Sequence, residues 1–568
     1  MQKITQWFPL LGQLANYSKD KWVSDVIAAV VVTVMLIPQS LAYAILAGLP
    51  PHYGLYASII PIVVYSLLGS STSLAVGPVA IASIMTASAL SSVVSAGLTT
   101  YVDGAITLAF LSGAMLFLLG IFRFGFVANF LSHSVISGFI TASGLIIAVG
   151  QLKHLMGVSV SGHTFFELAG ALIQSISGIN AATVALGASC LLFLVIARQY
   201  AARWLSMLGL SKNMASTVAR LSPIVAVCVS TAVVAVWSLD QLGVAIVGDI
   251  PAGIADPKVP AITREAVEAL LLPAFFIAII GYVESISVGR TLGAKKGEKV
   301  DSNQELIALG GANLASAAAG AFPVTGGFSR SVVNFDAGAK TQLAGIYTAI
   351  GIAIASMVLT PYLYYLPIAM LAATIVVAVL ALVDLSILKQ AWRFSKSDFT
   401  AVFLTIAITL SAGVEAGVAS GIIASVLLHL YHTSRPHIAE IGLIAGTEHF
   451  RNVKHYHVEV APQSVSLRID ESLIFSNANY LEEFIGEVVR DRPNLKNVIL
   501  HCGAVNTIDL TAMEMLEKLN ADLLKNGIKL HLSEVKIPVK SLLEKAHFLP
   551  KLGGQLYMSH LQAFADNR

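Results

Sequence analysis

The sequence predicts a polytopic α-helical membrane protein that ends in a small cytoplasmic α/β domain. Of the 568 residues, 56% are hydrophobic and only 12% are charged, whereas a soluble domain carries about 25% charged residues. Apolar stretches recur with little pause from about residue 24 to residue 432. From about residue 455 the chain is polar, and its hydrophobic residues follow the short periods of soluble strands and helices.

Residues 1–23 precede the first apolar stretch. The aromatic side chains of Trp7, Phe8 and Trp22 suit the headgroup region of a bilayer, so we expect this segment to lie at the cytoplasmic interface. It lacks the succession of charge, apolar run and cleavage site that defines a signal peptide. We therefore expect the first span to remain in the protein.

The region 24–432 is predicted to be the transmembrane domain. Its apolar stretches lie near 24–46, 52–69, 78–96, 103–121, 127–150, 181–198, 221–239, 266–289, 304–321, 329–338, 341–360, 365–383, 398–413 and 415–431. Several are shorter than the roughly 20 residues that a straight span requires. They predict fourteen spans.

The basic residues of the loops orient these spans, because cytoplasmic loops gather Lys and Arg. With the N-terminus inside, the inner loops hold Arg123, Arg198, Arg203, Lys212, Arg220, Arg290, Lys295, Lys296, Lys299, Lys340, Lys389, Arg393 and Lys396. The outer loops hold only Lys153, Lys258 and Arg264. This contrast predicts that both chain ends face the cytoplasm.

Two short stretches at matching places of the chain are interrupted by glycine and proline. The third stretch is entered through Ala75–Ala80 and the tenth through Pro323–Gly327. Seven spans per half is an odd number, so two similar halves would be inverted relative to each other. Such interrupted segments indicate a transporter binding site, with the N-termini of two half-helices facing each other near the midplane.

The segment Phe322–Arg330 combines a proline, two glycines, two hydroxyls and an arginine within an apolar region. Glycine loosens the backbone and proline withholds a donor, so we expect an unwound segment followed by a short helix from about Ser329. The free N–H groups and the positive end of that helix, together with Arg330, predict an anion site at membrane depth.

Arg330 and Glu284 are the charged residues expected to act in this site. A charge at the centre of a membrane helix costs roughly 2.5–3.5 kcal/mol on insertion scales, so Arg330 needs a partner or a role. We expect it to attract the anion; the alternatives are a structural ion pair or snorkelling. Glu284 lies in an otherwise apolar span and is the candidate for proton coupling. Its alternative is a permanent ion pair with Arg330.

Seven further residues are assigned to the substrate site: Gln39, Tyr43, Val79, Ala80, Thr325, Phe328 and Ser329. The Gln39 amide can donate to an anion or form a bond between helices. Tyr43, one turn later, lines the same wall or simply packs. The others supply backbone donors, a hydroxyl and an apolar rim, or serve helix packing and a local cap.

We expect neither an enzyme nor a bound cofactor or metal, because no nucleophile–base pair and no metal-ligand spacing is present. Cys190, Cys228 and Cys502 are isolated and predict neither a disulfide framework nor a zinc site. A glycine-rich phosphate loop with lysine is missing, so ATP-driven transport is not supported. The net charge of +2 gives no reason to expect nucleic acid.

The C-terminal region is predicted to consist of a linker, 433–456, and an α/β domain, 457–568. Strands are expected at Val465–Ile469, Val498–His501 and Ile528–Leu532, and helices at 477–490, 511–526 and 539–547. Strands that alternate with helices indicate an α/β fold. The predicted topology places this domain in the cytoplasm.

Several motifs of the membrane region resemble the signature of the sulfate-permease (SulP) anion transporters. They are Ile37–Tyr43, Ala47–Pro51, Gly54–Tyr56, Gly69–Ser71, Val76–Pro78 and Pro323–Arg330, and Asn506–Ala512 resembles a loop of the STAS domain found in that family. The resemblance implies a seven-plus-seven inverted repeat, with a core domain moving against a gate domain, usually in a homodimer. It also implies transport of small anions such as sulfate, bicarbonate, chloride or dicarboxylates, and regulation through STAS, by phosphorylation or by docking an acyl carrier protein.

Two departures from the family pattern refine these expectations. Members that use sodium tend to carry an aspartate and a following hydroxyl in the eighth span, where this chain has Glu284 and, four residues on, Val288. This favours protons over sodium. In the STAS loop Leu510 replaces a hydroxyl, which leaves Thr511 as the candidate phosphorylation site.

The leading interpretation is sulfate uptake by proton symport across the plasma (inner) membrane. A bicarbonate or C4-dicarboxylate transporter, possibly coupled to sodium, or an anion exchanger would use the same architecture. A membrane-anchored regulator that senses anions and acts through STAS is the alternative from another class. The intact Pro323–Gly327 segment and Arg330 argue against that regulator, because an anchor does not need them.

Overall fold

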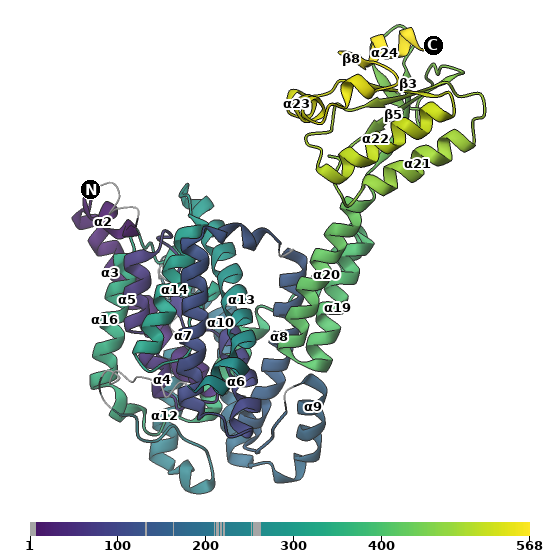
Figure 1. Ribbon diagram of the computed structural model, residues 1–568. Helices are drawn as coiled ribbons and strands as arrows, with labels where there is room; N and C mark the ends of the chain where they lie inside the picture. The colour runs from purple at the N-terminus through teal and green to yellow at the C-terminus, as the bar shows by residue number, and fades with distance from the viewer. Residues whose placement is uncertain are drawn as a thin grey trace. The chain divides into compact units, whose positions relative to one another are not determined.

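The structure is a computed structural model that describes residues 7–130, 133–162, 164–209, 211, 215, 218–219, 222–251, 253 and 263–568. Residues 1–6 of the predicted interfacial segment lie outside the described residues, as do Lys212, Arg220 and Lys258 of the predicted loops. The chain divides into two compact units, Met1–Ser425 and Val426–Arg568 (Figure 1).

The first unit is built almost entirely of helices (Figure 1). They are α2 (Pro9–Leu14), α3 (Lys19–Leu46), α4 (His52–Tyr56), α5 (Ile60–Leu68), α6 (Ala80–Ser95), α7 (Tyr101–Ile121), α8 (His133–Met156), α9 (Phe165–Gln174), α10 (Ala181–Met207), α12 (Ser222–Trp237), α13 (Arg264–Lys296), α14 (Ser302–Ala318), α15 (Phe328–Asp336), α16 (Leu343–Val358), α17 (Ile368–Leu380), α18 (Ser386–Phe394), α19 (Lys396–Ala412) and α20 (Val414–Ser434), the last of which continues into the second unit.

Length and apolar composition mark several of these helices as membrane spans. Within the described residues, six are long and apolar enough to cross a bilayer: α3, α7, α8, α10, α13 and α20. Shorter apolar helices accompany them, including α6, α12, α16 and α17. The sequence starts many of them with a polar cap: Ser18 accepts from Lys21 N, and Thr263 accepts from Ala266 N.

Glycines allow α7 and α14 to pack with their backbones in close approach. A Cβ at Gly113 of α7 would lie 2.7 Å from the backbone nitrogen of Leu314, and a Cβ at Gly310 of α14 would lie 2.5 Å from that of Phe117. No larger residue fits at either position without a shift of the backbone. Small residues therefore fix this helix pair, as is usual between membrane helices.

The second unit is an α/β domain around one six-stranded sheet. Its strands are β3 (Ile438–Leu443), β4 (Phe450–Asn452), β5 (Ser464–Ile469), β6 (Asn497–His501), β7 (Lys529–Ser533) and β8 (Leu556–Tyr557), in the order β4-β3-β5-β6-β7-β8. β5 to β8 are parallel, and β3 pairs antiparallel with both β4 and β5. Its helices are α21 (Ala478–Arg490), α22 (Leu510–Lys525), α23 (Ile537–Lys545) and α24 (His560–Asp566).

The three predicted strands and three predicted helices of this domain are confirmed as β5, β6, β7, α21, α22 and α23. The segment 433–456 differs from the prediction. We expected a linker there, but it contributes β3 and β4 to the sheet, with Ile438 opposite Ile469 of β5. Ile438 packs against the core of the domain, and Ala439 and Ile441, on the other face of β3, are also buried.

Candidate functional site

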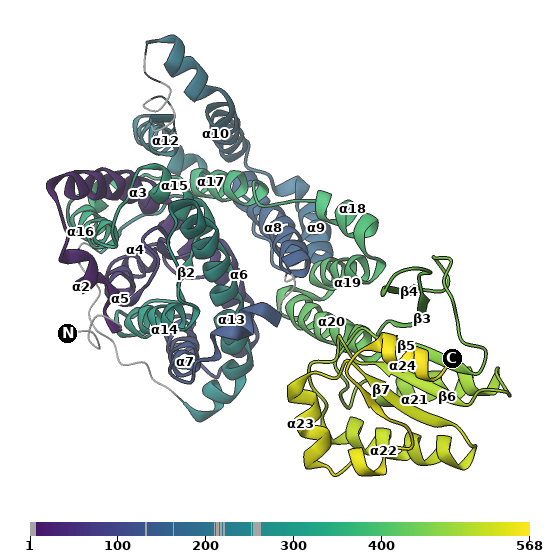
Figure 2. The ribbon, with the colours of Figure 1, turned by 90° about the horizontal axis from the view of Figure 1, so that it is seen from above.

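Two short strands cross in the interior of the first unit and bring two helix N-termini together. β1 (Val76–Gly77) pairs antiparallel with β2 (Thr325–Gly326), so that Val76 lies opposite Gly326 and Gly77 opposite Thr325. α6 begins at Ala80 and α15 at Phe328, directly after these strands. Figure 2 shows β2 and α15 among the surrounding helices α3, α6 and α13. The predicted unwound segment and short helix are therefore present, with the helix starting one residue earlier than expected.

Side chains of neighbouring helices hold β2 and the residue before it in place. The Asn313 amide of α14 binds the backbone of Val324 twice: Nδ2 donates to its oxygen at 2.8 Å and Oδ1 accepts from its nitrogen at 2.9 Å. The Ser285 hydroxyl of α13 accepts from Gly326 N at 2.8 Å. These bonds replace the helical hydrogen bonds that the unwound segment lacks.

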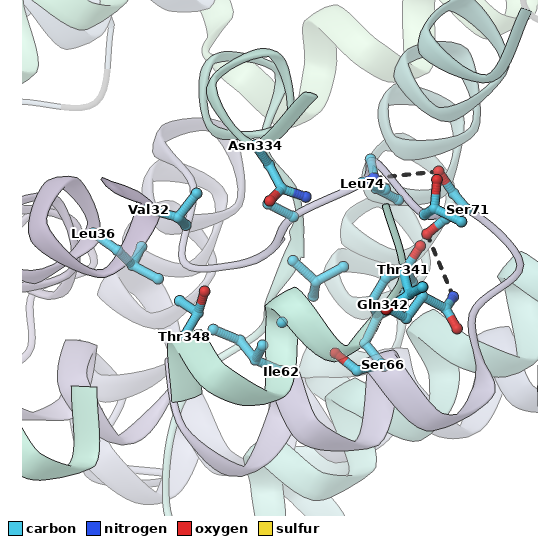
Figure 3. Close-up of a pocket in the computed structure, with 15 residues that line it drawn as sticks. Val32, Leu36, Ile62, Ser66, Ser71, Leu74, Asn334, Thr341, Gln342 and Thr348 are labelled. Carbon is cyan, nitrogen blue, oxygen red and sulfur yellow. Dashed lines mark hydrogen bonds between the residues drawn. The ribbon is translucent and has the colours of Figure 1, made fainter. Parts of the chain in front are cut away.

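The segment that leads to β1 is held in a similar way. The Ser331 hydroxyl of α15 accepts from Ala75 N at 2.9 Å, and Asn334 Nδ2 donates to Ser73 O at 3.2 Å. Figure 3 shows the cavity beside this segment, which both polar and apolar side chains line and where Gln342 Nε2 donates to Ser71 O at 3.4 Å. Side chains of α15 therefore position the segment that leads to α6, whereas side chains of α13 and α14 position the segment that leads to α15.

A small cavity lies where the N-termini of α6 and α15 meet. It is lined by the predicted residues Gln39, Tyr43, Val79, Ala80, Glu284, Phe328, Ser329 and Arg330, together with Ile81, Gly327, Ala378, Val379 and Leu382. Its volume is about 50 Å³, whereas one water molecule needs roughly 10–15 Å³ by the same measure. The cavity therefore has room for a small inorganic anion.

Arg330 lies in this cavity with its charge unpaired. The residue is 2% exposed, and neither Nη1 nor Nη2 has a hydrogen-bond partner among the residues that the structure describes. Glycines make the space for it: a Cβ at Gly77 would lie 3.1 Å from Nη1, and one at Gly327 would lie 2.9 Å from Nη2. A buried guanidinium without a partner is costly, so this arrangement favours a negatively charged ligand.

Glu284 stands between two cavities. It lines the anion-sized cavity and also an apolar cavity walled by Ile81, Phe139 and Val283, among others. Its Oε2 atom is buried and has no hydrogen-bond partner. Among the described residues no ion pair joins Glu284 to Arg330, so the alternative of a permanent ion pair is not what the structure contains.

Thr325 is the predicted binding residue that the structure does not bring into the cavity. Its hydroxyl donates to Gly281 O at 2.7 Å and lies 2.8 Å from the Ser285 hydroxyl. It therefore fastens β2 to α13. Thr511 lies elsewhere, on the exposed first turn of α22, next to the cap Asp509.

Sequence reasoning missed two groups of residues at this site. Ser285 and Asn313 hold β2 and Val324 in place through hydrogen bonds. Both are polar side chains within apolar spans, and this feature of the sequence could have indicated them. Ala378, Val379 and Leu382 form the wall contributed by α17 and its end. Their apolar character does not differ from that of any other membrane helix, so no signal pointed to them.

Comparison with known proteins agrees with this architecture. The profile of the Sulfate permease family matches residues 23–405, and that of the STAS domain matches residues 455–563. The chain belongs to the sulfate permease family. This confirms the predicted helical membrane protein with a C-terminal STAS domain, and it makes the protein a membrane transporter of a sulfate transporter family rather than an enzyme.

Relatives are similar over nearly the whole chain. A probable sulfate transporter of Mycobacterium tuberculosis is 34% identical over 550 residues, which cover 96% of this chain and 95% of that protein. Probable sulfate transporter 4.2 of Arabidopsis thaliana is 34% identical over 564 residues, covering 97% and 82%.

Solved structures show the same fold. Murine Solute Carrier 26 family member A9, an anion transporter in the inward-facing state, superimposes with a TM-score of 0.90 at 25% identity, covering 100% of this chain and 95% of that one. The transmembrane domain of the cyanobacterium bicarbonate transporter BicA gives a TM-score of 0.60 at 20% identity, covering 72% and 98%. At that identity the likeness concerns the fold alone.

Proposed function

We propose that this sulfate permease family member takes up sulfate by proton symport, with the anion bound between the N-termini of α6 and α15. The observation that carries the proposal is the buried, unpartnered guanidinium of Arg330 in a cavity of anion size. Similar proteins are named sulfate transporters, which favours sulfate over bicarbonate or a dicarboxylate.

The cavity offers an oxyanion three kinds of interaction. Arg330 supplies a full positive charge and donors in a fixed fork, which match the oxygens of a tetrahedral anion. The first turns of α6 and α15 supply backbone N–H groups and the positive ends of two helix dipoles. Gln39 supplies an amide donor without charge. Together they replace part of the hydration that sulfate loses.

Glu284 is the group that we propose to carry the coupled proton. Its unpartnered oxygen lies in a wall that is apolar on one side and faces the anion cavity on the other. A bound dianion so close to an ionised carboxylate would be repelled, so sulfate and a proton on Glu284 favour each other. This mutual preference is the coupling that a symporter requires.

The architecture of the carrier follows from the predicted topology. We propose fourteen spans in a seven-plus-seven inverted repeat, a core domain with α6 and α15 that moves against a gate, and assembly as a homodimer. The protein would lie in the plasma (inner) membrane, with the interfacial segment 1–23 and the STAS domain in the cytoplasm. The transporter domain would extend over 24–432, and the STAS domain would begin at β3.

The STAS domain is proposed to regulate transport. Thr511 is exposed on the first turn of α22, where a phosphate would be favoured by the helix dipole. Docking of an acyl carrier protein on this domain is a further proposal, which rests on the family resemblance.

Uptake of labelled sulfate into proteoliposomes tests the proposed function. Uptake by the wild type should rise with an inward proton gradient, and Glu284→Gln should keep sulfate uptake but lose this response. Glu268→Gln is the matched control, because Glu268 is an exposed acid on the same helix. No sulfate flux in the wild type under either condition would overturn the substrate, and an unchanged gradient response in Glu284→Gln would overturn the coupling residue.

A further inference from the structure

A second, larger cavity lies where α8 ends and where α10 and α17 begin. Its volume is about 510 Å³, within the range of roughly 300–1,000 Å³ that ligand sites occupy. It is ten times larger than the cavity at Arg330. A space of this size can hold a small ion that keeps much of its water, which the inner cavity cannot.

Lys153 gives this cavity its charge. The side chain is half-buried, and its ammonium donates to Val160 O at the long distance of 3.4 Å. Within the described residues no carboxylate lies within ion-pair distance of it, and no acid lines the cavity. Ser159 and Ser161 add hydroxyl groups to the same lining. A lysine without a carboxylate partner, in a cavity whose lining includes hydroxyl groups, is suited to an anion.

The N-terminus of α17 adds to the positive electrostatic potential in this cavity. Ile368 and Ala369, its first two residues, line the cavity, and no side chain caps this terminus. The positive end of the helix dipole therefore contributes to the potential that Lys153 creates. A helix terminus by itself would not mark a site, but here it reinforces an unpaired lysine.

The walls of the cavity are fixed by hydrogen bonds between distant segments. Asn180, the cap of α10, donates from its backbone nitrogen to Met156 O at 3.1 Å and from Nδ2 to Leu242 O at 2.8 Å. Ile368 N donates to Ala245 O at 2.9 Å, beside the bridge between Ile246 and Pro367. The site is thus formed before an anion arrives, which lowers the cost of binding.

α17 connects this cavity to the Arg330 cavity. Ala369 lines the larger cavity, and Val379 lines the inner one. The ten residues between them correspond to about 15 Å along the helix at a rise of about 1.5 Å per residue. In the predicted topology the α17 start, with Lys153, lies on the outer side of the membrane.

We propose that the Lys153 cavity is an outer vestibule that collects hydrated oxyanions such as sulfate before they reach Arg330. This rests on the proposed uptake of sulfate from outside. Lys153 raises the local anion concentration without removing the hydration shell, so the vestibule affects how readily sulfate is captured. It leaves the later steps of transport unchanged.

Protection of Lys153 from chemical modification tests the vestibule directly. Intact cells that express the protein are treated with a membrane-impermeant amine reagent, with sulfate or with gluconate at equal ionic strength, and modification of Lys153 is measured by peptide mass spectrometry. Sulfate should slow the reaction in the wild type and equally in Arg330→Gln. Protection that is no better than with gluconate would overturn the proposal, as would protection that is lost in Arg330→Gln.

Uptake kinetics supply the second measurement. Lys153→Gln should raise the KM for sulfate by about three- to tenfold with kcat nearly unchanged, and Lys153→Arg should restore it. Arg264→Gln is the control, because Arg264 is an exposed outer cation that is paired with Glu268 at 2.8 Å and lies outside the cavity lining. An unchanged KM in Lys153→Gln would contradict the vestibule. If the wild type carries no sulfate at all, the proposed function fails, while the protection experiment still decides the vestibule.

Discussion

Glu305 and Glu284 both lie among membrane helices, Glu305 fully buried and Glu284 half-buried with a buried Oε2 atom, but their surroundings are opposite. The Glu305 carboxylate is 0% exposed and accepts four hydrogen bonds: from Tyr65 Oη at 2.9 Å, from Ser70 N and Oγ at 2.8 Å each, and from Ser71 N at 3.0 Å. Glu284 has an unpartnered oxygen and faces two cavities. A buried acid that is fully satisfied holds the fold together, whereas one left unsatisfied beside a cavity is free to act.

Asp25 repeats the first pattern on α3. It is 0% exposed and accepts from Lys340 N at 2.6 Å, from Thr341 N at 3.0 Å and from the Tyr17 hydroxyl at 3.2 Å. Glu305 fastens the segment before β1, and Asp25 fastens the one after α15. The two satisfied acids therefore stabilise the segments that flank the β1–β2 pair and the half-helices. Arg330 and Glu284 line the cavity between these half-helices.

The largest expected effect on stability comes from breaking the satisfied acid. Glu305→Ala leaves buried donors of Tyr65, Ser70 and Ser71 without an acceptor, and each such loss costs about 1–3 kcal/mol. We expect a total destabilisation above about 3 kcal/mol, measured as a lower thermal unfolding temperature in detergent. Glu284→Gln should unfold close to the wild type. Equal stability of the two variants would contradict the comparison.

Thr325→Val distinguishes a fastening hydroxyl from a binding one. The substitution keeps the shape and removes the hydrogen bonds to Gly281 O and Ser285. We expect a destabilisation of about 1 kcal/mol and sulfate affinity within about twofold of the wild type. A loss of affinity of tenfold or more with unchanged stability would instead place the Thr325 hydroxyl on the anion.

His560 in the STAS domain is another buried ionisable group with an unsatisfied atom, and it should make the stability of the domain depend on pH. Its Nδ1 is 2.7 Å from the Ser533 hydroxyl, its Nε2 has no partner, and its ring packs edge-to-face on Phe450. Burial, with a smaller contribution from His501, lowers the pKa of His560 from 6.5 to about 3. Between these values the unfolded chain binds more protons than the folded one, so stability must fall as the pH falls.

The expected slope is at most about 1.4 kcal/mol per pH unit, and it should appear below about pH 6.5. Hydrogen exchange of α24 in the full-length protein, corrected for the intrinsic pH dependence of exchange, measures it. His560→Gln cannot titrate and should lose the slope. A slope that persists in this variant would assign the pH dependence to another group.

Much of the site could be predicted because its local signals are unusual. Glycine and proline inside a membrane stretch, followed by a charge, indicated two half-helices and Arg330, and α6 and α15 begin close to the expected positions. Glu284 stood out because its span is otherwise apolar. Charged and helix-breaking residues are rare in apolar membrane stretches, so their presence there marks them as candidate functional residues.

The roles of other residues depended on tertiary contacts that the sequence does not encode locally. A hydroxyl at Thr325 has the same signature whether it binds an anion or fastens a strand, and only the position of Gly281 decides between them. Glu305 lies in the first turn of α14, where an acid is ordinary. β3 and β4 were missed because strands depend on their pairing partners as well as on their own pattern: β3 pairs with β5, and β4 pairs with β3.

The measurement that tests the central claim most directly is equilibrium binding of sulfate to the purified protein. Isothermal titration should be carried out on Lys153→Gln, which removes the positive charge of the proposed vestibule, with and without Arg330→Gln. We predict that Arg330→Gln weakens binding at least about 30-fold, since losing one partner of a buried charged contact costs about 2 kcal/mol or more. Arg290→Gln is the control, because Arg290 lies in α13 outside the lining of the Arg330 cavity and donates to Ser302; this variant should bind sulfate normally. Unchanged sulfate affinity in Arg330→Gln would contradict the account.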